Sequence, residues 1–305
     1  MISVSAKKPG TMIVQHFDVS IPKTEPPQDK GWEQAWYGYH MMTKCWPFHR
    51  KVELEEQRQA ALAEGQVYER DFERDCFLSV LADIDKKNVN LFELGAGWGE
   101  WCLALAGVID YKIIPVVPTS YRCLAVEGEP THYRWIKEHL ESQNINGVAV
   151  HGAVSDKKGT CRFSVNAAPD DCYGQAIISL SDLTVRNAIW YLSNFVFRGT
   201  VKIPMYTIDH LRQLYGFEHV DIVDIDVQGA EYKVVLGATE SIKNDLIDYF
   251  LIGTHNHKFN DALRQLLSPK FDLIIDIYPN SLGIVDGFAP IRCHDGIQLY
   301  KRKNM

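Results

Sequence analysis

The stretch Phe92-Glu93-Leu94-Gly95-Ala96-Gly97-Trp98-Gly99 decides the fold that we predict for this chain of 305 residues. It follows a short apolar run and precedes an amphipathic segment, which predicts a strand, a tight turn and a helix. Glycines allow such a turn and let a ligand approach the backbone without meeting a Cβ atom. The free N–H groups at the start of the helix would face an anionic part of that ligand. The stretch therefore predicts a ligand-binding loop.

The spacing of the glycines separates two kinds of ligand loop. A dinucleotide-binding loop reads Gly-x-Gly-x-x-Gly, whereas the glycines here are spaced Gly-x-Gly-x-Gly. The carboxylate of Glu93, two residues before the first glycine, suits a cationic part of a ligand, such as the amino group of a methionine moiety. A nicotinamide site and a plain glycine-rich turn without a ligand are the alternatives.

Outward from this loop, strand-like apolar runs alternate with amphipathic segments from Asn88 onward. This alternation predicts an α/β fold with a parallel sheet covered by helices on both faces. We expect strands at 90–94, 123–127, 148–151, 220–226, 249–253 and 273–277, and helices at 100–106, 131–142, 230–236 and 259–267. A final run at 296–300 is expected to return as an edge strand. Residues 161–202 interrupt the alternation and are expected to form an insertion near the site.

Residues 1–86 differ in texture and are predicted to form an extension in front of a domain at 87–305. The first 30 residues are polar and rich in proline, which suits an extended arm. Residues 31–50 are dense in aromatic side chains, and 53–85 carry the apolar spacing of a helix. We interpret the aromatic segment as a packing or dimer surface, with a lid over the substrate as the alternative.

Composition limits the classes of partner. Acidic residues outnumber basic ones, 39 against 32, and the formal net charge is -7, which argues against nucleic acid or an anionic membrane as the main partner. The cysteines form no Cys-x-x-Cys pair and indicate neither a zinc site nor a disulfide framework. We find neither the pattern of a signal peptide nor an apolar run long enough to span a membrane, and we expect a cytoplasmic protein.

A second acidic residue ends the next predicted strand, in Ala125-Val126-Glu127-Gly128-Glu129-Pro130. An acidic side chain at this place can accept the hydroxyl protons of a ribose. Glu127 directly ends the apolar run, so we prefer it over Glu129. For Glu129 a place near the N-terminus of the following helix is equally consistent.

Two acids interrupt the predicted strand at 220–226. Asp224 and Asp226 lie on one face of that strand, where unpaired charges are costly. At the tip of the strand Asp226 would face the crevice where such folds bind ligands. Asp224 is expected to be a surface acid or an ion-paired one.

A histidine follows the next predicted strand, in Gly253-Thr254-His255-Asn256-His257. The reference pKa of ~6.5 permits histidine to transfer protons near neutrality. We expect His255 to act as a base and Asp226 to orient the substrate or the base. Asp226 with His255 or Asn256 could also hold a divalent metal ion; a loop histidine that meets solvent is the alternative for His255.

Four blocks, at 93–100, 125–130, 152–159 and 224–231, resemble the FkbM family of S-adenosylmethionine-dependent methyltransferases in their order and spacing. The resemblance covers residues from about 90 to 271. It implies a Rossmann-like seven-stranded methyltransferase fold, S-adenosylmethionine as the cofactor, and methylation of an oxygen, commonly on a sugar or secondary metabolite. The sequence departs from the family pattern at four places. The family usually has aspartate where Glu93 stands, lysine where Asp224 stands and glutamate where Gln228 stands. It also has a glutamate after the fifth strand, where this chain has Gly253-Thr254-His255.

The resemblance also implies that the loop and its neighbours bind the cofactor. The predicted cofactor-binding residues are Glu93, Gly95, Ala96, Gly97, Trp98, Gly99, Glu127, Gly128, Ala153, Val154 and Asp226. We therefore expect an O-methyltransferase that acts on a hydroxyl of a small molecule, as a monomer or a homodimer. A non-catalytic binding or partner protein on the same fold is the alternative.

Overall fold

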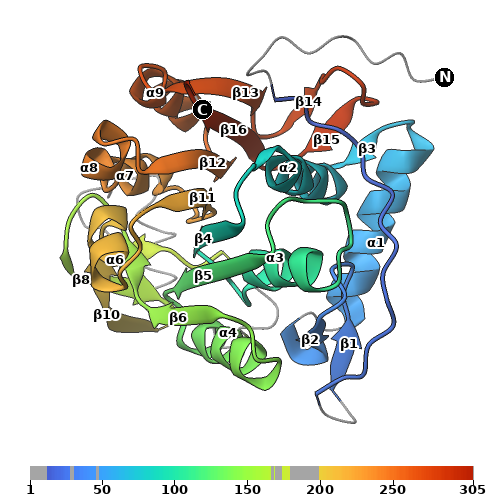
Figure 1. Cartoon of the computed structure of the whole chain (residues 1–305), viewed down its shortest axis with the longest axis horizontal. Coiled ribbons are helices and arrows are strands. Elements are labelled where there is room, and N and C mark those ends of the chain that lie inside the picture. Colours follow the sequence, from blue (N-terminus) through green and yellow to red (C-terminus); the bar gives the residue numbers. More distant parts are fainter. Residues whose placement is uncertain are drawn as a thin grey trace.

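The computed structural model describes residues 12–27, 31–45, 48–165, 168, 174–178 and 199–304. Its centre is a seven-stranded sheet in the order β13-β16-β12-β11-β4-β5-β6 (Figure 1). These strands are β4 (Asn88–Leu94), β5 (Ser120–Glu127), β6 (Gly147–His151), β11 (Val220–Ile225), β12 (Ile247–Thr254), β13 (Phe271–Ile277) and β16 (Gly296–Arg302). All six strands predicted ahead of 296–300 are present, and this is the sheet of the predicted Rossmann-like fold.

The last predicted strand is not an edge strand. β16 lies between β12 and β13 and pairs antiparallel with both. The chain leaves β13, forms the hairpin of β14 (Ser281–Gly283) and β15 (Ile291–Cys293), and then returns in the opposite direction. The expectation of an edge is wrong because the strand is paired on both sides, and its residues from Gly296 to Lys301 are buried accordingly.

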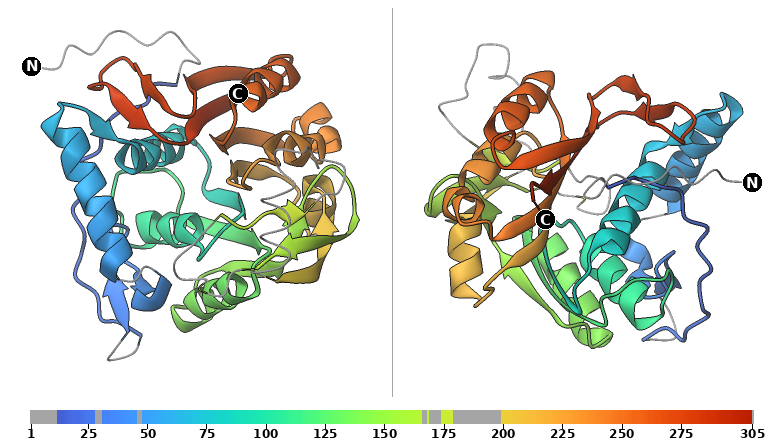
Figure 2. Two further views of the ribbon diagram at one scale, coloured as in Figure 1. Left: turned by 180° about the vertical axis from the view of Figure 1, so that it is seen from behind. Right: turned by 45° about the horizontal axis from the view of Figure 1, so that its top comes forward.

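Helices cover both faces of the sheet, as predicted (Figure 2). Alternate strand residues point to opposite faces, so Leu91 and Phe92 belong to two different hydrophobic cores. One face carries α2 (Glu69–Asp83), α3 (Glu100–Asp110) and α4 (Pro130–Ser142). The other carries α6 (Ile208–Leu214), α7 (Glu231–Leu236), α8 (Thr239–Lys243) and α9 (His257–Leu267). The carboxyl ends of the parallel strands lie between these two layers.

The helical region predicted at 53–85 is two helices. α1 (Phe48–Ala63) ends before Gly65, whose φ of 68° lies in the left-handed region that glycine adopts at helix ends. β3 (Val67–Tyr68) then pairs parallel with β15 before α2 begins. The break therefore joins the N-terminal part of the chain to its C-terminal hairpin.

The aromatic segment packs against the sheet and its helices. It contains β1 (Trp32–Gln34), β2 (His40–Met42) and the 3-10 turn Thr43–Cys45. Tyr37 is fully buried, and a Cβ atom at Gly107 of α3 would lie 1.9 Å from its carbonyl oxygen. Only a glycine in α3 allows this approach. Over the described residues the segment is a packing surface within the chain, while Trp46 lies outside them.

The predicted insertion contributes to a second sheet of order β7-β10-β8-β9. Its strands are β7 (Ala153–Val154), β8 (Gly159–Ser164), β9 (Ile177–Ile178) and β10 (Thr200–Tyr206). β8 pairs antiparallel with β10 over the whole length of β8. Residues 166–167, 169–173 and 179–198 of the predicted insertion lie outside the described part.

An ion cluster joins the amino ends of β11 and β12. Lys86 Nζ lies 2.7 Å from Asp221 and also contacts Asp248. His219 Nε2 and Arg302 Nη2 both lie 2.9 Å from Asp248 oxygens. His219, Asp221 and Asp248 are close enough to hold a metal ion, but the two carboxylates already have cationic partners. No helix in the described ranges is long and apolar enough to cross a membrane.

Asp248→Asn should lower the free energy of unfolding by about 3 kcal/mol at pH 7, because it removes one partner of a buried ion cluster. Burial raises the pKa of Asp248, but hydrogen bonds from His219 and Lys86 outweigh it and hold that pKa below its ordinary value. Native stability should therefore fall as pH falls below about 4, and it should fall less in the variant. Urea unfolding of the native protein and of the variant, at pH 7 and at a pH below 4, measures both effects. The exposed Asp272→Asn is the control. Equal acid sensitivity in native protein and D248N would contradict it.

Candidate active site

The glycine loop lies directly against the end of β11. A Cβ atom at Gly95 would stand 1.8 Å from the carbonyl oxygen of Asp226, and φ at Gly95 is 80°. The N–H of Asp226 donates to the Leu94 carbonyl at 2.9 Å, and the N–H groups of Gly95 and Ala96 donate to the Val126 carbonyl. Three neighbouring strand ends are thus held together at this loop.

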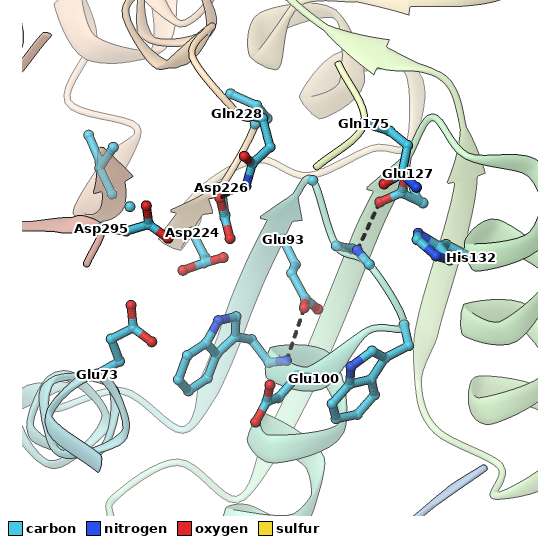
Figure 3. Close-up of a pocket in the computed structure, with 18 of the residues that line it drawn as sticks. Glu73, Glu93, Glu100, Glu127, His132, Gln175, Asp224, Asp226, Gln228 and Asp295 are labelled. Atoms are coloured by element: carbon cyan, nitrogen blue, oxygen red, sulfur yellow. Dashed lines mark hydrogen bonds between the residues drawn. The ribbon is translucent and has the colours of Figure 1, made fainter. Parts of the chain in front are cut away.

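Glu93 fixes the start of α3. Its carboxylate oxygens accept hydrogen bonds from the N–H groups of Trp101 at 3.0 Å and Cys102 at 2.9 Å, and Figure 3 draws one of these bonds as a dashed line from Glu93. These are helix N-terminal donors, which a carboxylate satisfies well. Burial raises the pKa of Glu93 to about 7, against the lowering effect of these hydrogen bonds. The predicted ligand carboxylate is thus also a structural cap, and each oxygen keeps a second lone pair for a ligand.

Glu127 connects the loop to the tip of β5. It accepts from the N–H of Gly97 at 2.8 Å and from that of Glu129 at 2.7 Å. Glu129 in turn accepts from the N–H groups of Thr131 and His132 at the start of α4. The preference for Glu127 agrees with this geometry, since Glu127 lines the cavity while Glu129 caps a helix.

Trp98 is held by a buried histidine. His139 Nδ1 lies 2.8 Å from the Trp98 carbonyl, and its Nε2 lies 2.9 Å from the N–H of Met42. Burial lowers the pKa of His139 to about 4, so the ring is neutral, accepts at Nε2 and donates at Nδ1. Trp32 lies edge-on to the same ring, with centroids 5.5 Å apart. Sequence reasoning missed His139, which looks like an ordinary helix residue.

A cavity of about 470 Å³ extends from this loop in two directions, a size typical of small-molecule sites. One end is mainly apolar: Ala153 and Val154 of β7, Phe163 of β8 and Ile177 of β9 line it together with Gly128. The Phe163 ring lies 2.6 Å from the Cβ position of Gly128, so only glycine fits beneath it. The second sheet therefore forms one wall of the cavity.

The other end is rich in charge. It is lined by Glu69, Arg70 and Glu73 of α2 and by Asp295 of the turn before β16. Arg70 pairs with Glu100 of α3. Burial raises the pKa of Glu73 to about 8, although Arg70 opposes this effect. These residues lie in the extension and in the C-terminal hairpin, and sequence reasoning named none of them.

Asp226 lies on the cavity wall, and 55 % of its side chain is exposed. Gln228, at a φ of 54°, donates to its carboxylate at 3.3 Å. Burial of the site raises the pKa of Asp226 to about 6; His255 lowers it and Asp295 raises it. Such a carboxylate is ionised at neutral pH and still basic enough to accept a proton.

His255 lies behind this wall. Its Nδ1 lies 2.7 Å from Glu231, and its Nε2 lies 3.4 Å from Asp226 and 3.7 Å from Asp295. Burial lowers the pKa of His255, but the hydrogen bond to Glu231 and the neighbouring carboxylates outweigh it and raise the pKa to about 9. His255 is therefore an imidazolium at neutral pH, and its Nε2 is almost without exposed surface. This geometry argues against His255 as the base.

The remaining acids and the predicted metal ligands are placed as follows. Asp224 is not a surface acid, because it is buried and lines the cavity, and it has no ion pair with any residue that the structure describes. Asn256 caps α9 by accepting from the N–H of Lys258 at 2.9 Å. A metal ion between Asp226, His255 and Asn256 therefore gains no support from the geometry.

The lining fits a nucleoside ligand with a cationic tail. The apolar end suits a base, Glu127 can accept ribose hydroxyls, and the acids around Asp224 suit positive charge. The family model of the methyltransferase FkbM domain, which is compared with the sequence, matches residues 95–277, more than half of the chain. The chain belongs to the FkbM methyltransferase family. Its methyl donor is accordingly S-adenosylmethionine.

Among solved structures this FkbM methyltransferase is similar to the C-terminal domain of precorrin-6Y C5,15-methyltransferase from Rhodobacter capsulatus. The two are 16% identical with a TM-score of 0.35 and coverage of 76% of this chain and 89% of that chain. A putative RNA methyltransferase from Pyrococcus horikoshii is 12% identical with a TM-score of 0.38 and coverage of 76% and 82%. No curated protein matches the chain.

Gly95→Ala should abolish binding of S-adenosylmethionine, because the new Cβ atom would collide with the Asp226 carbonyl and displace the loop. Isothermal titration calorimetry measures this. Gly216→Ala is the matched control: Gly216 also has a positive φ, of 67°, but nothing lies within 4 Å of its Cβ position. The control should lose about 1 kcal/mol of stability and keep its affinity. Native-like affinity in G95A would contradict the close approach.

Proposed function

We propose that this methyltransferase transfers a methyl group from S-adenosylmethionine to a hydroxyl oxygen of a small molecule. The observation that carries the proposal is the Asp226 carboxylate, which is exposed in the cavity wall beside the glycine loop. Its pKa of about 6 suits a general base at neutral pH. A hydroxyl, unlike an amine, carries a proton that has to leave as the methyl group arrives.

The donor would lie along the glycine loop. Gly95 to Gly99, Glu127 and Gly128 would hold its ribose and methionine parts, and Ala153 and Val154 its adenine. When bound, S-adenosylmethionine supplies a methyl group on a positively charged sulfur. The contribution of the chain is orientation, which can lower a barrier by ~7–11 kcal/mol when both partners are well placed.

The acceptor would lie at the charged end of the cavity. Polar side chains from three separate elements line it: Gln57 of α1, Arg70 of α2 and His294 of the β15-β16 turn. Such lining offers hydrogen bonds to a molecule with several hydroxyl groups, such as a sugar. The volume of about 470 Å³, shared with the donor, favours a small acceptor.

The proposed roles of Asp226 and His255 are the reverse of those predicted from the sequence, which were His255 as base and Asp226 as the orienting residue. Asp226 would accept the hydroxyl proton, and the His255 imidazolium, held by buried Glu231, would hold Asp226 in its ionised form. A base contributes typically ~10²–10⁴-fold to such a step. Glu231 is thus a positioning residue, and its place in the block at 224–231 was the only signal in the sequence.

The pH dependence of kcat/KM distinguishes the two assignments. With Asp226 as base, kcat/KM should rise with pH through about 6 and then level off, because only the ionised carboxylate accepts a proton. His255→Gln should move this limb to higher pH, since the imidazolium lowers the pKa of Asp226. Asp295→Asn should move it to lower pH, because the Asp295 charge raises that pKa. Initial rates with labelled donor on a panel of sugars and hydroxylated metabolites measure this.

The same pH profiles can also contradict the assignment of Asp226 as the base. If His255 were the base, the limb would lie near 9 and disappear in H255Q. Asp226→Asn should lower turnover by ~10²–10⁴-fold and keep the affinity for S-adenosylmethionine within a few fold. An Asp226→Asn enzyme with native turnover would exclude Asp226 as the base.

A further inference from the structure

Asp224 is a buried carboxyl group that faces the cavity. It is 6 % exposed and lines the cavity, and its carboxyl group lies beside that of Asp226 in the close-up (Figure 3). Within the described ranges its side chain has neither a hydrogen bond nor an ion pair. A buried polar group without a partner is costly, so a group that enters the cavity is its natural partner.

The surroundings of Asp224 specify the charge of that partner. Glu93 of β4 stands directly opposite it in the strand register, and Leu251 of β12 stands on its other side. Glu73 of α2, Glu100 of α3 and Asp226, which directly follows β11, line the same cavity (Figure 3). The pKa of Asp224 lies well above its usual value. Burial is the largest cause, and the nearby negative charges of Glu93, Asp226, Glu73 and Glu100 raise it further. A cation is therefore the partner that this set of acids favours.

We propose that Asp224 recognises the positively charged sulfur of S-adenosylmethionine and makes the site prefer the donor over its demethylated product. The inference rests on Asp226 as the residue at the reacting hydroxyl. Asp226 directly follows β11, and residues two apart in an extended chain lie ~7 Å from each other. A donor that delivers its methyl group to an oxygen held at Asp226 would therefore have its sulfur within reach of the Asp224 carboxyl group, which lines the same cavity.

The product S-adenosylhomocysteine has the same adenine, ribose and amino acid, but its sulfur is neutral. Asp224 ionises when the charged sulfur approaches and has no such gain from the product. The attraction between the Asp224 carboxylate and the charged sulfur is therefore lost when the methyl group is transferred. This loss favours release of S-adenosylhomocysteine and binding of a new S-adenosylmethionine. Glu53 of α1, by contrast, lines the cavity with 48% of its side chain exposed and paired to Arg50.

Calorimetry with the two ligands tests this. Asp224→Asn keeps the shape of the side chain and should weaken binding of S-adenosylmethionine about tenfold, while binding of S-adenosylhomocysteine changes less than twofold. Glu53→Gln makes the same carboxyl-to-amide change elsewhere on the cavity wall and should leave both affinities unchanged. Urea unfolding of the variants shows that each is folded. Equal loss for both ligands in D224N would assign Asp224 to the shared ammonium group, and no loss for either would leave it without a role; both outcomes overturn the proposal.

Proton release gives a second readout at pH 7. Binding of S-adenosylmethionine, titrated in phosphate and in Tris, should release more protons from the native protein than from D224N. Glu73, Glu93 and Asp226 also face the ligand, so the difference between the two proteins is the quantity that counts. Equal release would contradict ionisation of Asp224. If the native protein bound no S-adenosylmethionine, the proposed function itself would fail; if binding and turnover persist without preference, only this inference fails.

Discussion

The close approach of Gly95 to the Asp226 carbonyl is the constraint on which the rest of the site depends. Parallel pairing of β4 with β11 brings the two strand ends together, but only a residue without a Cβ atom lets the loop lie flat against its neighbour. The loop that would hold the donor and the backbone that carries the Asp226 carboxylate are consequently in direct contact. This contact would fix the position of the donor relative to the acceptor, and such orientation is a large part of the rate acceleration in a displacement reaction.

Local patterns in the sequence predicted most of the central fold. Six strands and four helices could be found because apolar spacing reports which face of an element is buried. The position of β16 could not be found, because pairing on both sides depends on where β12 and β13 leave room, and its residues 296–300 look the same at an edge. The break between α1 and α2 was missed for a similar reason, since the pairing of β3 with β15 joins residues more than 200 positions apart.

The site was predictable to the level of strand ends but not of side-chain direction. Glu127 ends β5, Asp226 directly follows β11, and both line the cavity. Glu93 carries two helix N–H groups, and His255 stands behind the wall against Glu231; neither fact follows from spacing. The charged end comes from Glu69, Arg70, Glu73 and Asp295, residues whose proximity depends on how the extension and the C-terminal hairpin meet.

The neutral ring of His139 has a consequence for how this enzyme could vary. One of its nitrogens holds the carbonyl of Trp98 in the cofactor loop, and the other holds the Met42 N–H in the segment at 31–45. A change in that segment therefore reaches the donor site without altering any residue of the cavity. A substitution in β1 or β2 would therefore shift the glycine loop, and with it the affinity for the donor, while every residue that lines the cavity stays the same.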